Sequence, residues 1–168
     1  LPISAALPAS LPTTVRVVVV PPGGEMADSL RAAGEQLPDD TAAVVVFPVD
    51  HALVEAETVL ALLATLVRSG CGVALPLFRG KPGHPIAMAR AVFAEIAAPG
   101  AVLRDLVRKD GARVRAVPSA NPWVHADLDH PEDHRAALCA LHGEPWSTVA
   151  QMFRHRSHRA YRPDPVPQ

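Results

Sequence analysis

Cysteine is scarce in this chain, and an excess of either charge is missing. The two cysteines, Cys71 and Cys139, lie in apolar surroundings without CxxC spacing. A disulfide framework or a zinc knuckle needs a regular cysteine pattern, so the sequence favours a reduced, cytoplasmic protein. Lys plus Arg number 16 against 17 Asp plus Glu. This balance excludes a global field for nucleic acid or an anionic membrane, so any anionic ligand must be held by a local site.

Long apolar runs are missing as well. No run approaches the roughly 20 residues that are needed to span a bilayer. The N-terminal stretch LPISAALPASLPTTV is apolar, but it has no basic n-region and is interrupted by prolines, so it does not resemble a signal peptide. With 168 residues and 49% hydrophobic positions, the chain can bury one sizeable core, and we expect one domain.

Short valine-rich runs recur along the chain. Continuous apolar runs of this kind are typical of strands that are buried on both faces of a sheet. They predict strands at 15–20, 42–47, 72–78, 112–117 and 123–128.

Segments with helical period lie between these runs. The clearest is 55–70, where apolar residues recur at i, i+3, i+4 and i+7 from Val59 and Gly70 is the stop. Two more helices are predicted over 26–37 and from Pro131 to Leu141. The alternation predicts an α/β fold of the Rossmann-like, three-layer, doubly wound type with a mostly parallel sheet, whose ligands bind beyond the carboxyl ends of the strands.

Three parts of the chain are expected to differ in organisation. We predict an irregular N-terminal segment over 1–14, the α/β domain over 15–143, and a C-terminal segment over 144–168 with one helix near 147–156 and a proline-rich end. The Arg- and His-rich stretch in that last segment is interpreted as a solvated helix end, with nucleic-acid contact as the alternative.

Asp50 follows an otherwise apolar run, at the edge where this architecture places ligands. Its carboxylate either binds a ligand or caps the helix expected to begin near Val54. The four-residue gap is long for an N-cap, whose side chain reaches two or three residues ahead, so the spacing favours a ligand-binding role.

A second acidic cluster, DLDHPEDH, also follows an apolar stretch and leads into a helix. If Pro131 is the first helical residue, His130 is a poor cap. If Asp129 is the cap, Glu132 stands three residues further on, as in a capping box. Asp129 is then partly structural, and Asp127 is the freer carboxylate.

Two carboxylates from separate strand ends suit Mg²⁺, which prefers oxygen ligands and keeps several waters or substrate phosphates. Asp50 and Asp127 are therefore the candidate catalytic and metal-binding pair. An alternative metal site would join Asp127 to His130 and His134, which are spaced i, i+4.

Four segments occur in the order EMADSLRAAG, FPVDHAL, RGKPGHP and DLDHPED. They resemble the G-M-S-x-S-L-R-x-G, P-x-D-x-P-L, R-G-x-x-G-H-P and D-I-D-T-P-E-D motifs of the MobA/MocA-like nucleotidyltransferases. The resemblance implies a nucleotide-diphospho-sugar transferase-like fold and the transfer of CMP or GMP from CTP or GTP to a phosphorylated acceptor such as molybdopterin, with loss of pyrophosphate. By the same likeness, Asp50 and Asp127 hold Mg²⁺.

Two further segments are candidate ligand-binding sites. In RGKPGHP, Gly83 lets backbone amides approach an anion, while Lys81 and His84 add polar side chains. By resemblance this loop faces the acceptor, and the alternative is an ordinary solvated turn. Ser29 and Arg31 lie at the start of a predicted helix, where amide donors favour a phosphate or carbonyl of the nucleotide. A polar helix surface is the alternative there.

The sequence also departs from the family pattern. The family opens with a strand and a glycine-rich loop, L-A-A-G-x-S-x-R-M-G-x-x-K, which grips the triphosphate, and nothing here matches it. We therefore expect that first unit to lie upstream of Leu1 and the chain to be N-terminally truncated. Ala52 stands where the family usually has proline, and His130 replaces a capping threonine. Activity then depends on the missing segment, and the alternative function is an inactive relative that binds a cofactor precursor or a protein partner.

Overall fold

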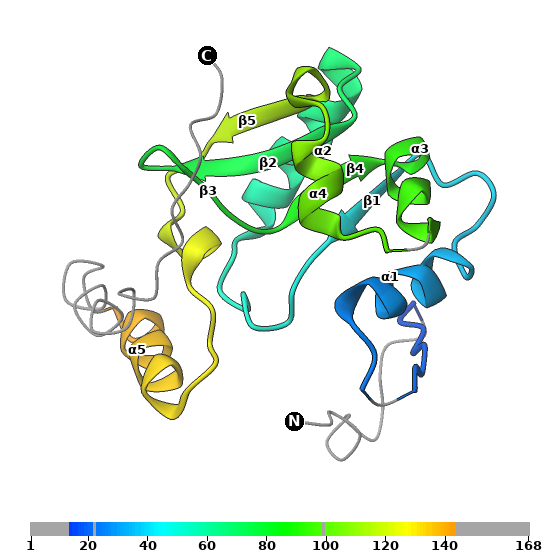
Figure 1. The fold of residues 1–168 in the computed structure, drawn as a ribbon. Helices are drawn as coiled ribbons and strands as arrows, with labels where there is room; N and C mark the ends of the chain where they lie inside the picture. The colour runs from blue at the N-terminus through cyan, green and yellow to red at the C-terminus, as the bar shows by residue number, and fades with distance from the viewer. Residues whose placement is uncertain (1–13, 22, 99, 144–168) are drawn as a thin grey trace.

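The computed structural model describes residues 14–21, 23–98 and 100–143, which form helices around one sheet (Figure 1). The helices are α1 (Met26–Gly34), α2 (Ala56–Ser69), α3 (Arg90–Phe93), α4 (Leu103–Arg108) and α5 (Pro131–Leu141). Three 3-10 helices are η2 (Ala94–Ala97), η3 (Gly111–Arg113) and η4 (Pro122–His125). The strands are β1 (Ala43–Val46), β2 (Val73–Phe78), β3 (Lys81–Pro82), β4 (Ile86–Ala89) and β5 (Val114–Pro118).

The sheet combines a parallel set of strands with one antiparallel hairpin. β5 pairs with β2 in parallel, and β4 lies between β1 and β2 and is antiparallel to both. β1, β2 and β5 therefore run in one direction, as the alternation of valine-rich runs and helices predicted. The pairing itself is not mostly parallel, because β4 stands between β1 and β2 and three of the four pairings are antiparallel. β3 and β4 return along β2 as the second arm of a hairpin, which the sequence reading treated as a loop.

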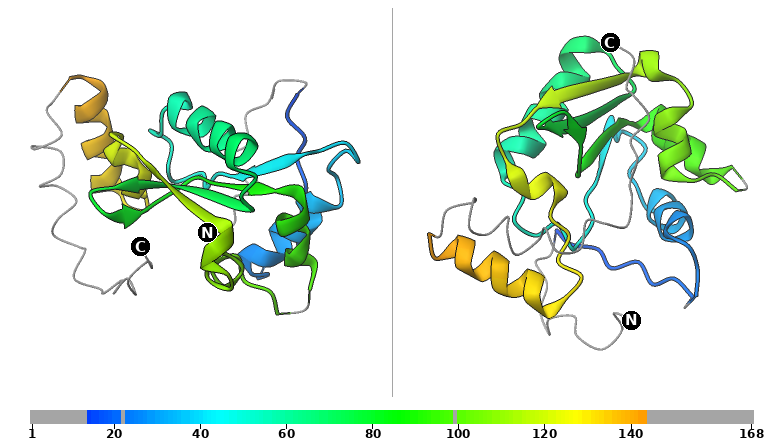
Figure 2. Two further views of the ribbon diagram at one scale, coloured as in Figure 1. Left: turned by 90° about the horizontal axis from the view of Figure 1, so that it is seen from above. Right: turned by 60° about the vertical axis from the view of Figure 1, so that its left-hand side comes forward.

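Helices cover both faces of this sheet. On one face, residues of α1, α3, η2 and α4 pack with β-strand residues such as Val73 and Met88, both fully buried. On the other face, Leu62 and Leu66 of α2 pack against Ala74 and Ala87. Figure 2 shows α2 on one side of the sheet and α1 with α4 on the other. This arrangement confirms the three-layer α/β architecture.

α2 is the helix that the sequence predicted best. Leu62 and Leu66 of the predicted stripe are buried, whereas Val59 and Leu63 are half-buried and Thr58 extends the buried face, and Gly70 ends the helix with φ 62 in the left-handed region. Glycine adopts that conformation without a Cβ clash, so it ends a helix readily. No helix of the described residues is long and apolar enough to cross a membrane.

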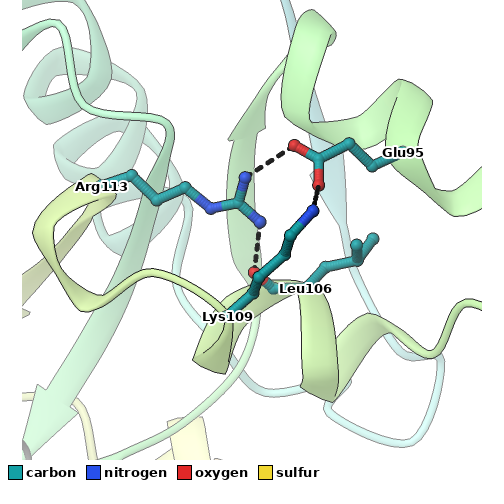
Figure 3. A network of polar contacts seen from close by, with 4 residues as sticks. All are labelled: Glu95, Leu106, Lys109 and Arg113. Carbon is teal, nitrogen blue, oxygen red and sulfur yellow. Dashed lines mark hydrogen bonds and ion pairs between the residues drawn. The ribbon is translucent and has the colours of Figure 1, made fainter.

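A polar network connects the short helices on the sheet face opposite α2. The carboxylate of Glu95 in η2 accepts hydrogen bonds from Arg113 Nη1 at 2.6 Å and from Lys109 Nζ at 3.3 Å (Figure 3). Arg113 Nη2 also donates to the backbone oxygen of Leu106 in α4. Hydrogen bonds that involve charged partners are stronger than neutral ones. This network therefore ties η2, α4 and the start of β5 together.

Two predicted strands are wrong. Residues 15–20 are in the described part of the chain but belong to no strand, and Val19 is 88% exposed. Valine favours a strand only when a neighbouring strand supplies the ladder, and no strand of the described residues does so for this segment. The stretch 123–128 was also predicted as a strand, but Asn121 caps Trp123 and Pro122 occupies the first turn of η4, so local capping replaces extended pairing. The helix predicted near 147–156 lies outside the described residues.

Candidate functional site

Asp50 lies in a turn beyond the carboxyl end of β1. The strand ends at Val46, and two turns follow. In the first, His51 N donates to Pro48 O at 3.2 Å, and in the second, Val54 N donates to His51 O at 3.1 Å. α2 begins only at Ala56, with Glu55 in the N-cap position. Asp50 is thus not the cap of this helix, and that alternative is wrong.

A main-chain hydrogen bond brings the second acidic segment to Asp50. The amide of Leu128 donates to the backbone oxygen of Asp50 at 3.0 Å. Asp127 precedes Leu128 directly and is exposed, so both carboxylates belong to the same end of the sheet. The sequence reading paired these two acids, and the structure brings their segments into contact.

The short helix η4 contacts both segments that carry the candidate site residues. Trp123 O lies 3.4 Å from His51 Nδ1, and Val124 O accepts from His84 N at 2.8 Å. Asn121 caps the helix through its Oδ1, which accepts from Trp123 N at 2.8 Å. η4 therefore holds the turn that carries Asp50 and the segment that carries His84 in one place, as Figure 1 shows in yellow beside the end of β2 and β3.

Gly83 allows the hairpin to approach η4. Two residues lie between Ala74 and Leu77 on β2, whereas four lie between their partners Ala87 and Pro82 on the other arm, so the segment around Gly83 bulges out of the ladder. A Cβ on Gly83 would lie 2.4 Å from Val124 O, well inside contact distance. Only glycine fits this close backbone approach. Gly83 thus approaches the protein's own backbone, and its predicted role beside an anion stays a prediction.

His84 lies against His51 within reach of both acids. The centroids of the two rings are 4.9 Å apart, and His51 is buried. Burial lowers the pKa of His84 and the neighbouring His51 lowers it further, while the carboxylates of Asp50 and Asp127 oppose that shift. His84 is therefore held in its neutral form more strongly than an exposed histidine, beside two acids.

The chemistry of the two acids fits a hard divalent cation. Asp50 Oδ1 is buried and has no hydrogen-bond partner among the described residues, which is costly for a carboxylate oxygen. Mg²⁺ uses one or two protein carboxylates and completes its shell with water or phosphate oxygens. No group of three or more His, Cys, Asp or Glu side chains in the described part of the chain is placed to hold a metal ion. The alternative site on His130, His134 and Asp127 is therefore not formed.

His125, the last residue of η4, contacts β2 and β3. Its Nε2 lies 3.0 Å from Lys81 O, and its ring packs edge-on against Phe78 with centroids 5.8 Å apart. Because a carbonyl oxygen can only accept, Nε2 carries the proton in this contact. Burial lowers the pKa of His125, and the hydrogen bond to Lys81 opposes the shift. The side chain of Lys81 itself is exposed, next to this ring.

The structure corrects the capping of α5. Pro131 is the first residue of the helix and His130 is the N-cap residue, so Asp129 is not the cap. The buried carboxylate of Asp133 accepts from His130 N at 2.8 Å, and this bond supplies the missing cap. The prediction failed because Asp133, and not Glu132, is the acid three residues after the N-cap.

Ser29 and Arg31 lie on α1, away from the acid pair. Arg31 Nε donates to the backbone oxygen of Ile96 at 3.1 Å, and Nη1 forms an ion pair with Asp28. The amide of Glu25 at the start of α1 donates to Asp28 Oδ2 at 2.8 Å. An acidic side chain thus occupies this helix start, where a phosphate was predicted, and Arg31 joins α1 to η2. Ser29 is exposed, and its nucleotide-binding role stays a prediction.

Two shallow grooves border the other side of α1. One is lined by Val19, Val20, Arg31 and Glu35 among others, and the second by Arg16, Gln36 and Leu37 among others. Both lie between α1 and the extended segment that precedes it. Neither groove touches Asp50, His84 or η4, so we place the candidate site at the acid pair.

Sequence reasoning missed three polar residues of the site. His51 is 6% exposed and Asn121 is 5% exposed, and His125 joins β3 to η4. His51 adjoins Asp50 in sequence, which was the one available signal. Asn121 precedes Pro122, a pattern typical of a cap and proline at a helix start, and this signal could have located η4.

Three comparisons relate this chain to known proteins. A family model described as a MobA-like NTP transferase domain matches residues 3–119. A homolog of Mycobacterium tuberculosis Rv0371c from Mycobacterium sp. strain JC1 shares 20% identity with a TM-score of 0.54, covering 77% of this chain and 59% of that protein. Rv0371c from M. tuberculosis H37Rv shares 26% identity with a TM-score of 0.51, covering 67% of this chain and 59% of that protein.

A further solved structure widens the likeness in fold. The 4-diphosphocytidyl-2C-methyl-D-erythritol synthase of Anaerococcus prevotii DSM 20548 shares 12% identity with a TM-score of 0.59, covering 71% of this chain and 67% of that protein. No curated protein matches the sequence. The chain thus spans about three fifths of the Rv0371c-type proteins that it resembles.

Proposed function

Since this chain belongs to the family of MobA-like NTP transferase domains, we propose that it carries the metal- and acceptor-binding part of a nucleotidyltransferase. In this proposal the protein moves CMP or GMP from CTP or GTP to a phosphorylated acceptor of the molybdopterin type and releases pyrophosphate. The observation that carries the proposal is the junction of the two acidic segments, where Leu128 N donates to Asp50 O and Asp50 Oδ1 is buried without a partner.

Asp50 and Asp127 would hold Mg²⁺ as carboxylate ligands. When bound, the ion supplies the positive charge that polarises an α-phosphate and balances charge on a leaving pyrophosphate. The rigid turn after β1 and the main-chain bond to Leu128 fix where the Asp50 carboxylate can lie. Preorganised ligands of this kind need no rearrangement when charge develops.

His84 and Lys81 would face the acceptor from the hairpin side. The lowered pKa of His84 keeps its ring neutral near neutral pH, so it offers a hydrogen bond without adding charge. Lys81 adds an exposed cation near His125, suited to a phosphate oxygen. No side-chain nucleophile is required, because the acceptor phosphate is itself the attacking group.

Replacement of Asp50 by asparagine tests the proposal. Asp50→Asn keeps the size of the side chain but removes the charge that holds the cation. We expect the variant to lose Mg²⁺ binding in isothermal titration calorimetry and to lose pyrophosphate release with CTP or GTP and a phosphorylated acceptor. Asp129→Asn is the matched control, because Asp129 is an exposed acid two residues from Asp127 and should leave both readouts unchanged.

The outcomes separate the two candidate functions. Unchanged Mg²⁺ binding and pyrophosphate release in Asp50→Asn would refute the metal assignment. Metal and acceptor binding by the unaltered protein, without pyrophosphate release from either nucleotide, would instead identify an inactive relative that binds a phosphorylated precursor.

A further inference from the structure

Buried polar atoms without partners concentrate at one place in this fold. Among the described residues, four buried side-chain atoms lack a hydrogen-bond partner. One is Arg113 Nε, in the network around Glu95. The other three are Asp50 Oδ1, His84 Nδ1 and Asn121 Nδ2, which all lie on the segments that meet at η4. Such atoms are rare in folded proteins and need a reason, which a ligand can provide.

Of these three residues, Asp50 belongs to the acid pair and His84 to the hairpin segment that is proposed to face the acceptor. Asn121 has no role yet in the proposed site. Its side chain is 5% exposed, so its amide group has left bulk water. Its Oδ1 accepts from Trp123 N at 2.8 Å, and this contact also fixes which end of the amide is oxygen, because an NH2 group cannot accept. The NH2 end is then oriented by the cap and donates to nothing in the described chain.

The surroundings of Asn121 are rigid and connect directly to the site. Asn121 N donates to Ser119 Oγ at 3.1 Å, and Ser119 N donates to Leu77 O at 2.9 Å, which anchors the residue to the end of β2. One residue beyond Pro122, Trp123 O lies 3.4 Å from His51 Nδ1, next to Asp50. The amide is thus held in place by bonds on both sides.

We propose that Asn121 is a specificity residue whose side-chain NH2 donates a hydrogen bond to a phosphate oxygen of the ligand bound beside Asp50 and His84. An NH2 group only donates, so its partner must be an acceptor atom, and phosphate oxygens are strong acceptors. The inference rests on the proposed function for the position of that phosphate. The phosphate belongs either to the nucleotide or to the acceptor.

A cap-preserving substitution separates this role from the structural one. Asn, Asp and Ser are equally good N-caps, so Asn121→Ser and Asn121→Asp keep an acceptor for Trp123 N and remove the NH2 donor. We expect inorganic phosphate, in the presence of Mg²⁺, to bind roughly tenfold to a hundredfold more weakly to both variants, with a thermal midpoint close to that of the unaltered protein. Asp110→Ser is the control, because Asp110 caps η3 in the same way at the other end of β5.

Nuclear magnetic resonance of the unaltered protein provides an independent measurement. We expect the side-chain NH2 signals of Asn121 to shift when inorganic phosphate is added, if the acceptor supplies the oxygen, or when CTP or GTP is added, if the nucleotide does. Absence of a shift with all three ligands would overturn the inference, and so would unweakened binding, by folded Asn121→Ser, of the ligand that causes the shift. A phosphate-dependent shift without any pyrophosphate release would keep it while refuting the proposed function.

Discussion

The close approach of Gly83 to η4 gives the most direct test of how the site is assembled. Replacement by alanine adds one methyl group, whose carbon would lie 2.4 Å from Val124 O and 2.9 Å from His125 Cδ2. The backbone oxygen cannot rotate away as a flexible side chain could. We therefore expect Gly83→Ala to push η4 away from the hairpin and to weaken the bond from His84 N to Val124 O.

The cost follows from two contributions. Overpacking a tight contact costs about 1–3 kcal/mol, and weakening one backbone hydrogen bond costs about 1 kcal/mol more. A total of about 2–4 kcal/mol lowers the melting temperature of a chain of this size by roughly 4–16 °C. Because η4 also positions Asp50 through His51, we expect Mg²⁺ binding to weaken in parallel with stability.

Chemical denaturation and calorimetry measure both effects. The matched control is Gly111→Ala, because an added Cβ there meets no atom within 4 Å and its φ is not positive. That substitution should be neutral or stabilise the fold by up to about 1 kcal/mol. If Gly83→Ala unfolds at the same denaturant concentration as the unaltered protein, the proposed contact between hairpin and η4 does not constrain the fold and the reasoning fails.

Three more substitutions and titrations test other parts of the structure. Asp133→Ala removes the carboxylate that accepts from the amide of the N-cap residue His130 and should cost about 0.5–2 kcal/mol in denaturant unfolding, while equal stability would contradict the cap. The lowered pKa of His84 predicts a proton NMR titration midpoint below that of free histidine, and Asp50→Asn should lower it further, since Asp50 opposes the shift. The hydrogen bond from Arg113, and after it the one from Lys109, lower the pKa of Glu95 in the folded protein. The ionised Glu95 therefore stabilises the fold above the usual glutamate pKa, and this stabilisation is lost as the pH falls through the lowered pKa. The unfolding free energy of Glu95→Gln should therefore change less between pH 7 and strong acid than that of the unaltered protein, and parallel curves would argue against the network.

The sequence predicted those elements whose signals are local and repeated. α2 has two turns of apolar spacing and a terminal Gly70, and β2 and β5 are continuous valine- and alanine-containing runs that pair in parallel. These patterns specify both the element and the face that it buries. The family resemblance, read from four short motifs, is confirmed by the match over 3–119.

The errors arose where a contact from elsewhere in the chain decides the structure. The run at 15–20 has strong strand propensity but no neighbouring strand among the described residues, and 123–128 is drawn into η4 by the cap at Asn121. The sequence does not show that Gly83 faces Val124 O or that Asp133 reaches back to His130 N. The pairing of the Asp50 and Asp127 segments was predicted from the rule that strand ends of one direction share one edge of a sheet, although Asp127 follows η4 and not a strand.

Several of the bonds that assemble this site join main chain to main chain, beside the side-chain contacts of His51, Asn121 and His125. Leu128 N donates to Asp50 O, His84 N to Val124 O and Gly83 N to Pro76 O. These bonds do not depend on the identity of the side chains, except at position 83, where a Cβ would clash with Val124 O. Substitutions at most of these positions therefore leave the geometry intact. A framework of this type tolerates sequence change, in keeping with the fold that this chain shares with proteins of 12% to 26% identity.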